Sequence, residues 1–256
     1  MRFRVKYRVE YKIFIWRIGK EMTPKYKRVL LKLSGEALAQ GSDGILNHEF
    51  LGKVAEVIKK CCDDGIQVAV IVGAGNIWRG RQGTDMDRVR ADHMGMLATT
   101  INSLALQDAF EHKGLHAHVM TADEMDTFTE HYTTRAAVKH LENGDVVIFG
   151  CGLGAPFFST DTAAVLRAAE IEADAVLMAK NIDGVYTADP AKDSSAVRLD
   201  EVTYKDILAK ELKALDMTAT TFCMENDIEL YAFALSDPMN IYRVIMGEKI
   251  GTVIHK

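Results

Sequence analysis

From residue 28 onward, short continuous apolar runs alternate with longer segments in which apolar residues recur every three or four positions. The first pattern predicts buried strands and the second predicts helices that cover them. The apolar runs predict strands at 28–33, 66–72, 116–120, 145–149, 174–179, 228–235 and 252–255. Helical spacing predicts helices after Asn47, around 94–105, at 133–141, 161–172 and 204–215, before 228 and after Pro238. This alternation predicts an α/β fold with a mainly parallel central sheet.

Two local patterns sharpen this prediction. The long helix of the second quarter carries a stripe that we expect to face the core, formed by Met94, Leu97, Ile101, Leu104 and Ala105. Further on, Asp183-Gly184 between two short extended pieces is typical of a hairpin turn.

The composition changes this picture little. The chain has 256 residues, 48% of them hydrophobic, and a net charge of −5, as expected of a globular protein with a large core. Basic residues gather before residue 29, so the remainder is acidic, which disfavours a nucleic-acid partner. No apolar run approaches the roughly 20 residues that span a bilayer, which disfavours a membrane partner. The four cysteines form no disulfide or zinc spacing, and we expect a cytoplasmic protein.

Three histidines near the end of the long helix, His112, His116 and His118, resemble a metal-binding set by their number alone. Gly114 lies between the first two and is expected to end the helix, so they do not share a face. We therefore expect surface histidines and no metal bound by the protein.

Residues 1–21 alternate basic and apolar residues, with an apolar run too short for a secretory signal. Met22 opens a segment that leads directly into the first strand, so we expect translation to start there, with residues 1–24 outside the folded domain. A basic arm and a transit-like peptide are the alternatives.

Three of the predicted strands lead into loops that contain glycine. Lys32 lies near the end of the first strand and is followed by Ser34-Gly35, and the other two loops are 73–76 and 150–154. Glycine loops at strand ends let backbone N–H groups approach anionic oxygens, and a lysine adds a cation. The pattern predicts a polyphosphate site, and tight strand-to-helix turns are the alternative.

The motif of a P-loop is absent, but Gly150, Gly152 and Ala155 fit the Gly-x-Gly-x-x-Ala spacing of a dinucleotide site. Pro156 follows at once, where a helix should already have opened, which disfavours that interpretation. Two aspartates could have a purely structural role instead of a role in binding. Asp92 could be a helix-start residue, and Asp161 could be a helix cap.

With these residues in place, the chain resembles the bacterial UMP kinases of the amino-acid-kinase family. The resemblance runs from about residue 26 to 255. It rests on Lys-Leu-Ser-Gly-Glu-Ala-Leu at 32–38, Gly-Ala-Gly-Asn-Ile-Trp-Arg-Gly at 73–80, Asp-His-Met-Gly-Met-Leu at 92–97, Pro-Phe-Phe-Ser-Thr-Asp-Thr at 156–162 and Asp-Gly-Val-Tyr-Thr-Ala-Asp-Pro at 183–190. It implies a three-layer α/β/α sandwich, a UMP-binding lobe at 25–177 and an ATP-binding lobe at 178–256.

The resemblance also implies roles for single residues. Lys32, Arg79 and Asp161 would be catalytic, with Asp161 orienting lysines rather than acting as a base. The ATP-binding set would be Lys32, Leu33, Ser34, Gly35, Gly75, Arg79, Asn181, Tyr186 and Asp189. The UMP-binding set would be Ala74, Asp92, Leu153, Gly154, Ala155, Pro156, Phe157, Phe158, Ser159 and Thr160.

The implied reaction needs Mg²⁺ carried by ATP and no cofactor bound by the protein. The implied partners are UMP, ATP, UTP as an inhibitor and further copies of the chain in a hexamer. Activation by GTP is not expected, because the segment 40–44 is short where related enzymes carry a GTP-responsive loop. Leu153 and Ala155 replace two polar residues of the family pattern, so backbone groups must read the uracil. Lys180 is a candidate for the family's second lysine, because Met178 stands at the expected position.

Two alternatives to a UMP kinase remain open from the residues. One is a nucleotide-binding storage or regulatory protein without turnover, which the joint presence of Lys32, Arg79, Asp92 and Asp161 disfavours. The other is a small-acid kinase on the same fold, which the segment 92–99 disfavours.

Overall fold

The computed structural model describes residues 23–78 and 85–256. Our expectations about residues 1–21, the start at Met22 and Arg79 lie outside these residues. Within them, none of the helices is both long and apolar enough to cross a membrane.

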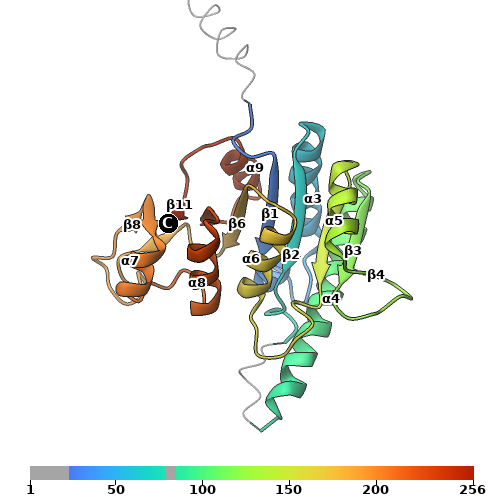
Figure 1. Cartoon of the computed structure of the whole chain (residues 1–256), viewed down its shortest axis with the longest axis horizontal. Helices are drawn as coiled ribbons and strands as arrows, with labels where there is room; N and C mark the ends of the chain where they lie inside the picture. Colours follow the sequence, from blue (N-terminus) through green and yellow to red (C-terminus); the bar gives the residue numbers. More distant parts are fainter. Residues whose placement is uncertain (1–22, 79–84) are drawn as a thin grey trace, which may run out of the picture.

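A large central sheet organises the described residues (Figure 1). Its order is β4-β3-β5-β2-β1-β6-β10-β11-β9, and neighbouring strands are parallel except β10 and β11. In that order the strands are Glu130–His131, Ala117–Thr121, Val146–Gly150, Gln67–Val72, Arg28–Leu33, Ala175–Lys180, Leu230–Ala234, Thr252–His255 and Glu201–Thr203. The expected mainly parallel sheet is therefore confirmed.

Helices cover both faces of the sheet. Buried side chains of α2 (Gly35–Ala39), α3 (His48–Asp63), α4 (Arg88–Glu111) and α9 (Met239–Ile245) join one core. Those of α5 (Thr134–Glu142), α6 (Thr160–Glu170), α7 (Tyr204–Ala209) and α8 (Met217–Asn226) join the other. One sheet thus lies between two layers of helices, with an apolar core on each face. This is the expected three-layer α/β/α sandwich.

The alternation of side chains along β1 decides where its one charged residue points. Val29, Leu31 and Leu33 join the core under α3, whereas Leu30 joins the core on the face of α6. Successive side chains of a strand alternate between faces. Lys32 therefore lies on the face that α6 covers.

Several predicted boundaries are confirmed. The strands at 28–33 and 252–255 have the predicted limits. The side chains of Asn47 and Thr203 cap α3 and α7 by accepting hydrogen bonds from Phe50 and Asp206 N–H. Helix α7 nevertheless ends at Ala209 rather than at 215.

The predicted core stripe of α4 is confirmed for Leu104 and Ala105, which pack against the core, but was wrong for its other three residues. Met94, Leu97 and Ile101 are 39%, 53% and 47% exposed. The buried face of the helix is instead rich in small and polar residues: Ala98, Thr99, Thr100, Asn102 and Ser103. A β-carbon on Gly150 would lie 3.3 Å from Ser103 Oγ, so the helix passes too close to β5 for large side chains. The amino-terminal half of α4 projects past the sheet (Figure 1).

The predicted hairpin turn at Asp183-Gly184 was also wrong. Strand β7 (Val185–Tyr186) pairs antiparallel with β8 (Arg198–Leu199), so the loop 187–197 closes this hairpin. Gly184 precedes β7, and a β-carbon there would lie 2.5 Å from Thr252 Oγ1. Glycine is present because the chain passes close to β11, a reason that the local sequence does not show. The predicted lobes stay a prediction, and their boundary at 177/178 falls inside β6.

Candidate active site

The three glycine loops lie at the carboxyl ends of adjacent parallel strands. Strands β5, β2, β1 and β6 are neighbours in the sheet, and the loops follow β1, β2 and β5. Gly73 N–H donates to Leu33 O at 3.0 Å, which joins the second loop to the end of β1. The carboxyl end of a parallel sheet is where open α/β folds bind ligands.

Gly35 is the point of closest approach between the first two loops. A β-carbon at Gly35 would lie 2.5 Å from Gly73 O and 2.7 Å from Gly75 N. These are backbone atoms, so no side chain can be accommodated without moving a loop. The contact explains why Ser34 is followed by glycine.

The buried polar face of α4 holds the second and third loops. Asn102, fully buried, donates to Gly73 O at 2.8 Å and exchanges amide hydrogen bonds with Asn76. Thr99 Oγ1 accepts a hydrogen bond from Cys151 N–H at 2.9 Å. Neither Asn102 nor Thr99 was predicted from the sequence. The signal was present as polar residues at helical spacing on the face opposite the apolar stripe.

Lys32 forms an ion pair with Asp161. Their side chains approach to 3.0 Å, with 14% and 22% of each exposed. Ser159 caps α6, because its side chain accepts from Thr162 N–H, and Asp161 stands in the first turn. Asp161 is therefore not the cap, and its carboxylate is directed to the lysine of β1.

Lys180, the last residue of β6, belongs to the same charged group. Burial lowers the pKa of its ammonium group; the charge of Asp161 raises it, and that of Lys32 lowers it. The Lys180 ammonium also donates to Ala214 O. Asp161 thus lies near two lysines that come from the neighbouring strands β1 and β6. Sequence reasoning considered Lys180 but left it out of the candidate residues.

Asp92 lies at the edge of a cavity of about 200 Å³ between α4 and the third loop. The cavity is lined by predicted residues Ala74, Asp92, Leu153, Ala155, Phe158, Ser159 and Thr160, and by Trp78, Ala91, Gly95, Met96, Thr99 and Gly152, which were not predicted. Among the described residues, Gly154, Pro156 and Phe157 are outside its lining. The structure therefore brings most of the predicted UMP-binding set to one place.

The interactions of Asp92 exclude the helix-start interpretation. Helix α4 begins at Arg88 and is capped by Asp87, so Asp92 lies one turn inside it. Its carboxylate accepts hydrogen bonds from Arg88 Nε and from Phe157 N–H, each at 2.8 Å. Burial raises the pKa of Asp92, but these two bonds outweigh it, and the pKa is below its usual value. The aspartate is held ionised at the cavity.

A second cavity, of about 330 Å³, lies beside the β7–β8 hairpin. Tyr186 and Asp189 line it together with the segment 210–213, which was not predicted. The hydroxyl of Tyr186 donates to Asp183 at 2.8 Å. Asp189 accepts from Ala191 N–H and pairs with Lys213, and both interactions lower its pKa. Asn181 lies outside the lining and donates to Glu36 at 3.5 Å.

The chain is similar to known proteins in both sequence and fold. Residues 27–233 match the profile described as the amino acid kinase family. A UMP kinase structure from Bacillus anthracis superposes with a TM-score of 0.87 at 38% identity, covering 91% of this chain and 97% of the other. One from Ureaplasma parvum gives 0.86 at 36% identity, covering 91% and 100%. A uridylate kinase from Archaeoglobus fulgidus gives 0.68 at 27% identity, covering 88% and 99%.

Proposed function

This chain belongs to the amino acid kinase family, and we propose that it is a UMP kinase that transfers the terminal phosphoryl group of ATP to UMP. The observation that carries the proposal is the Lys32–Asp161 ion pair with Lys180 beside it. Asp161 adjoins Thr160, which lines the cavity at Asp92, and Lys180 leads into the segment that lines the cavity at Tyr186. The charged group is therefore close along the chain to residues that line each of the two cavities. Structural similarity to two UMP kinases supports the choice of substrate.

The reaction places few demands on proton transfer. The acceptor is a phosphate oxygen of UMP, which is already ionised near neutral pH, so no general base is needed. In-line phosphoryl transfer then depends on alignment of the two substrates and on neutralisation of the charge on the transferred group. Lys32 supplies a cation, and Asp161 fixes its position. Mg²⁺ arrives with ATP as part of that substrate.

For ATP, we assign the nucleoside to the cavity of Tyr186 and Asp189. We assign its phosphates to Lys32, Leu33, Ser34, Gly35 and Gly75. Gly35 supports this assignment, because a loop without side chains lets backbone N–H groups approach phosphate oxygens. Arg79 and Asn181 remain part of this assignment as predictions.

For UMP, we assign the ribose to the ionised Asp92 and the phosphate to the neighbourhood of Ala74. The loop 153–160 would enclose the nucleotide. Leu153 and Ala155 carry no polar group, so hydrogen bonds to uracil would come from the backbone. The positive φ angles of Cys151, Gly152, Gly154 and Phe157 support this reading, because such backbone turns peptide groups in unusual directions.

We further propose that the enzyme works in pyrimidine nucleotide synthesis in the cytoplasm, as a homo-oligomer that is expected to be a hexamer. The exposed residues Met94, Leu97 and Ile101 support self-association, because a row of large apolar side chains on one helix is costly in water. Inhibition by UTP and the lack of a response to GTP stay predictions.

A panel assay tests the proposal. The purified chain would be given ATP, Mg²⁺ and one acceptor at a time: UMP, CMP, dUMP, AMP, GMP, glutamate, aspartate or carbamate. Formation of ADP and of the phosphorylated product would be measured. We expect turnover with UMP well above that with every other acceptor. Turnover with an amino acid would make the chain a small-acid kinase. Binding of ATP and UMP without any product would make it a nucleotide-binding protein that lacks activity.

A further inference from the structure

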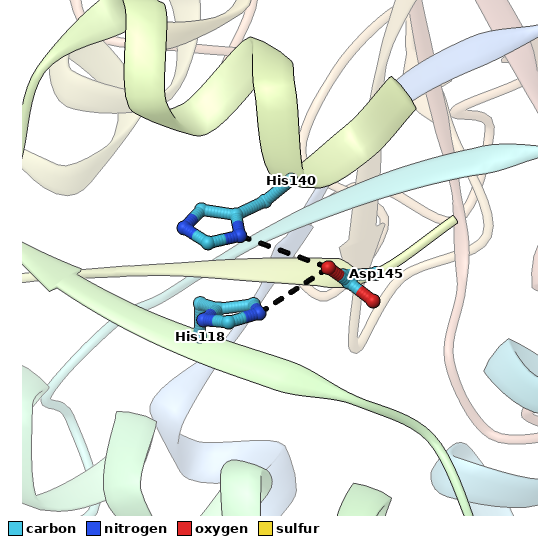
Figure 2. Close-up of side chains that lie close together, drawn as sticks. All are labelled: His118, His140 and Asp145. Atoms are coloured by element: carbon cyan, nitrogen blue, oxygen red, sulfur yellow. Dashed lines mark ion pairs between the residues drawn. The ribbon is translucent and has the colours of Figure 1, made fainter. Parts of the chain in front are cut away.

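Two histidines and an aspartate meet on the outer part of the sheet (Figure 2). His118 lies on β3, His140 on α5, and Asp145 in the turn between α5 and β5. Asp145 Oδ2 is 3.4 Å from His118 Nε2 and 3.7 Å from His140 Nδ1. All three side chains are largely shielded, with 26%, 20% and 19% exposed. Sequence reasoning had grouped His118 with His112 and His116 as surface residues, which the structure corrects.

Glu130 of β4 holds the other side of both rings. Its carboxylate oxygens lie 2.7 Å from His118 Nδ1 and 3.1 Å from His140 Nε2. These distances are those of hydrogen bonds, whereas the distances to Asp145 are too long for good ones. The two rings stack with centroids 3.6 Å apart. Each ring thus has one nitrogen bound to Glu130 and one nitrogen directed towards Asp145.

The longer distances match the spacing of ligands around a metal ion. In a tetrahedral zinc site with bonds of about 2.1 Å, neighbouring ligand atoms are about 3.4 Å apart. The two nitrogen–oxygen distances, 3.4 and 3.7 Å, are close to this spacing, and the two nitrogens and the oxygen all lie within 4.8 Å of one another. Such a mixed donor set suits zinc, whereas Mg²⁺ and Ca²⁺ prefer oxygen alone. We propose that His118, His140 and Asp145 form a Zn²⁺-binding site, with water as the fourth ligand.

Glu130 completes the arrangement that such sites need. A histidine that binds zinc usually donates its second N–H to a carboxylate, which fixes the ring and its tautomer. Glu130 accepts from both rings and so leaves the nitrogens that face Asp145 with free lone pairs. Two neutral histidines and two carboxylates also balance the charge of Zn²⁺.

The position of the site predicts its effect. His118 is the second residue of β3, and Asp145 immediately precedes β5, so the cluster lies at the amino ends of these strands. The glycine loops follow the carboxyl ends of β1, β2 and β5, at the opposite edge. Bound zinc would join β3, α5 and the turn before β5. It would therefore stabilise this part of the sheet and leave phosphoryl transfer unchanged.

The test uses the full chain freed of metal with a chelator and then titrated with ZnCl₂ alone. Binding would be measured by competition with a chromophoric chelator, and stability by thermal unfolding. We expect one equivalent of zinc per chain and a rise in Tm of about 5 °C or more at zinc concentrations about 100-fold above Kd. Cobalt should give the strong visible absorption of a tetrahedral N/O site.

Four variants make the assignment specific. His140→Ala and Asp145→Asn should each weaken zinc binding at least about 100-fold, and Glu130→Gln about 10- to 100-fold, as a residue that positions ligands should. His112→Ala is the matched control, since this exposed histidine pairs only locally with Asp108. It should bind zinc as the wild type does. Circular dichroism of each metal-free variant would verify folding below its Tm.

Stoichiometric binding that His140→Ala and Asp145→Asn abolish, with UMP-dependent turnover unchanged by Asp145→Asn, would support the site. The proposal is overturned if the wild type binds no more zinc than the folded Asp145→Asn variant does, or if His112→Ala removes the binding. A loss of zinc binding cannot be confused with a failure of the proposed kinase activity, because binding is measured without nucleotide.

Discussion

The ammonium group of Lys32 lies 3.0 Å from the carboxylate of Asp161, so a lysine from the end of β1 is fixed by the first turn of α6. An ion pair shielded in this way holds the lysine in one place. It also keeps a cation near the end of β1, just before the first glycine loop. The role that we propose for this charge can be tested directly.

Replacement of Lys32 by alanine should remove activity without unfolding the chain. A positioned cation that stabilises charge in a transition state contributes about 100-fold or more to kcat, so we expect at least that loss. Steady-state assays with UMP and ATP would measure it. Lys59→Ala is the matched control, because Lys59 forms an exposed pair with Asp63. A Lys32→Ala enzyme with nearly normal kcat would refute the assignment.

Asp92→Asn should weaken UMP alone. The change keeps the shape but removes the charge that strengthens hydrogen bonds to ribose hydroxyls, an effect of about 1–3 kcal/mol. The KM for UMP should rise about tenfold or more, and the KM for ATP should change less than twofold. Each nucleotide would be varied in turn.

The control for this substitution is Asp108→Asn, which removes an exposed carboxylate from the same helix. If Asp92 serves only to hold Arg88 and Phe157 N–H, the variant will melt at a lower temperature with both KM values unchanged. A selective defect for ATP would mean that the two cavities are assigned to the wrong nucleotides.

Lys180 should make the stability of the chain depend on alkaline pH. Its pKa in the folded protein is below the usual 10.5, chiefly through burial. Between these two values the unfolded chain binds more protons than the folded one, so the free energy of unfolding rises with pH in that window. Lys180→Met lacks this gain. Its stability relative to the wild type should therefore be highest near neutral pH and should fall as the pH approaches 10.5.

Denaturant titrations from pH 7 to pH 10 would measure this difference. Lys180→Met also loses the hydrogen bond to Ala214. We expect this loss to lower the free energy of unfolding by the same amount at every pH, so the pH dependence of the difference is unchanged. Lys59→Met, at an exposed position, should show no such slope. A difference between wild type and Lys180→Met that does not vary with pH would contradict the prediction.

The exposed face of α4 should hold copies of the chain together. Ile101→Glu would place a charge in the apolar row, and light scattering should then report a lower mass than for the wild type. Phe128→Glu is the control, because Phe128 is 56% exposed but lies on the loop before β4. An unchanged mass for Ile101→Glu, or a wild type that is monomeric, would rule out this interface.

The sequence predicted those parts of the fold that depend on local pattern. β1 is a continuous apolar run, and Asn47 stands where a cap is needed, so both could be read from neighbouring residues. Parallel strands buried on both faces give an especially clear signal. The grouping of Ala74, Asp92 and the loop 153–160 was instead implied by the resemblance to UMP kinases, because Asp92 lies inside α4 and no local pattern connects it with the loop.

The failures have a common physical origin in contacts between distant segments. For Met94, Leu97 and Ile101 the apolar stripe of α4 indicated the wrong face, because the helix passes so close to β5 that small and polar residues lie between them. Asp183-Gly184 has the sequence of a turn, but glycine is needed there because a β-carbon would collide with Thr252 of β11. His118 and His140 are separated by a strand and most of a helix. Their stacking depends on how β3 and α5 pack.

The contact between Gly35 and the second loop sets a limit on how this sequence can vary. A side chain at position 35 would collide with the backbone at Gly73 and Gly75, so in a library of all substitutions only glycine should survive selection for activity. Gly152 differs, because no atom within 4 Å would block a β-carbon there. The cost of a side chain at this position comes only from the backbone, whose φ is +56°. Asparagine and aspartate tolerate that backbone. Two glycines of the same site would therefore show opposite mutational tolerance, one fixed by its neighbours and the other open to change.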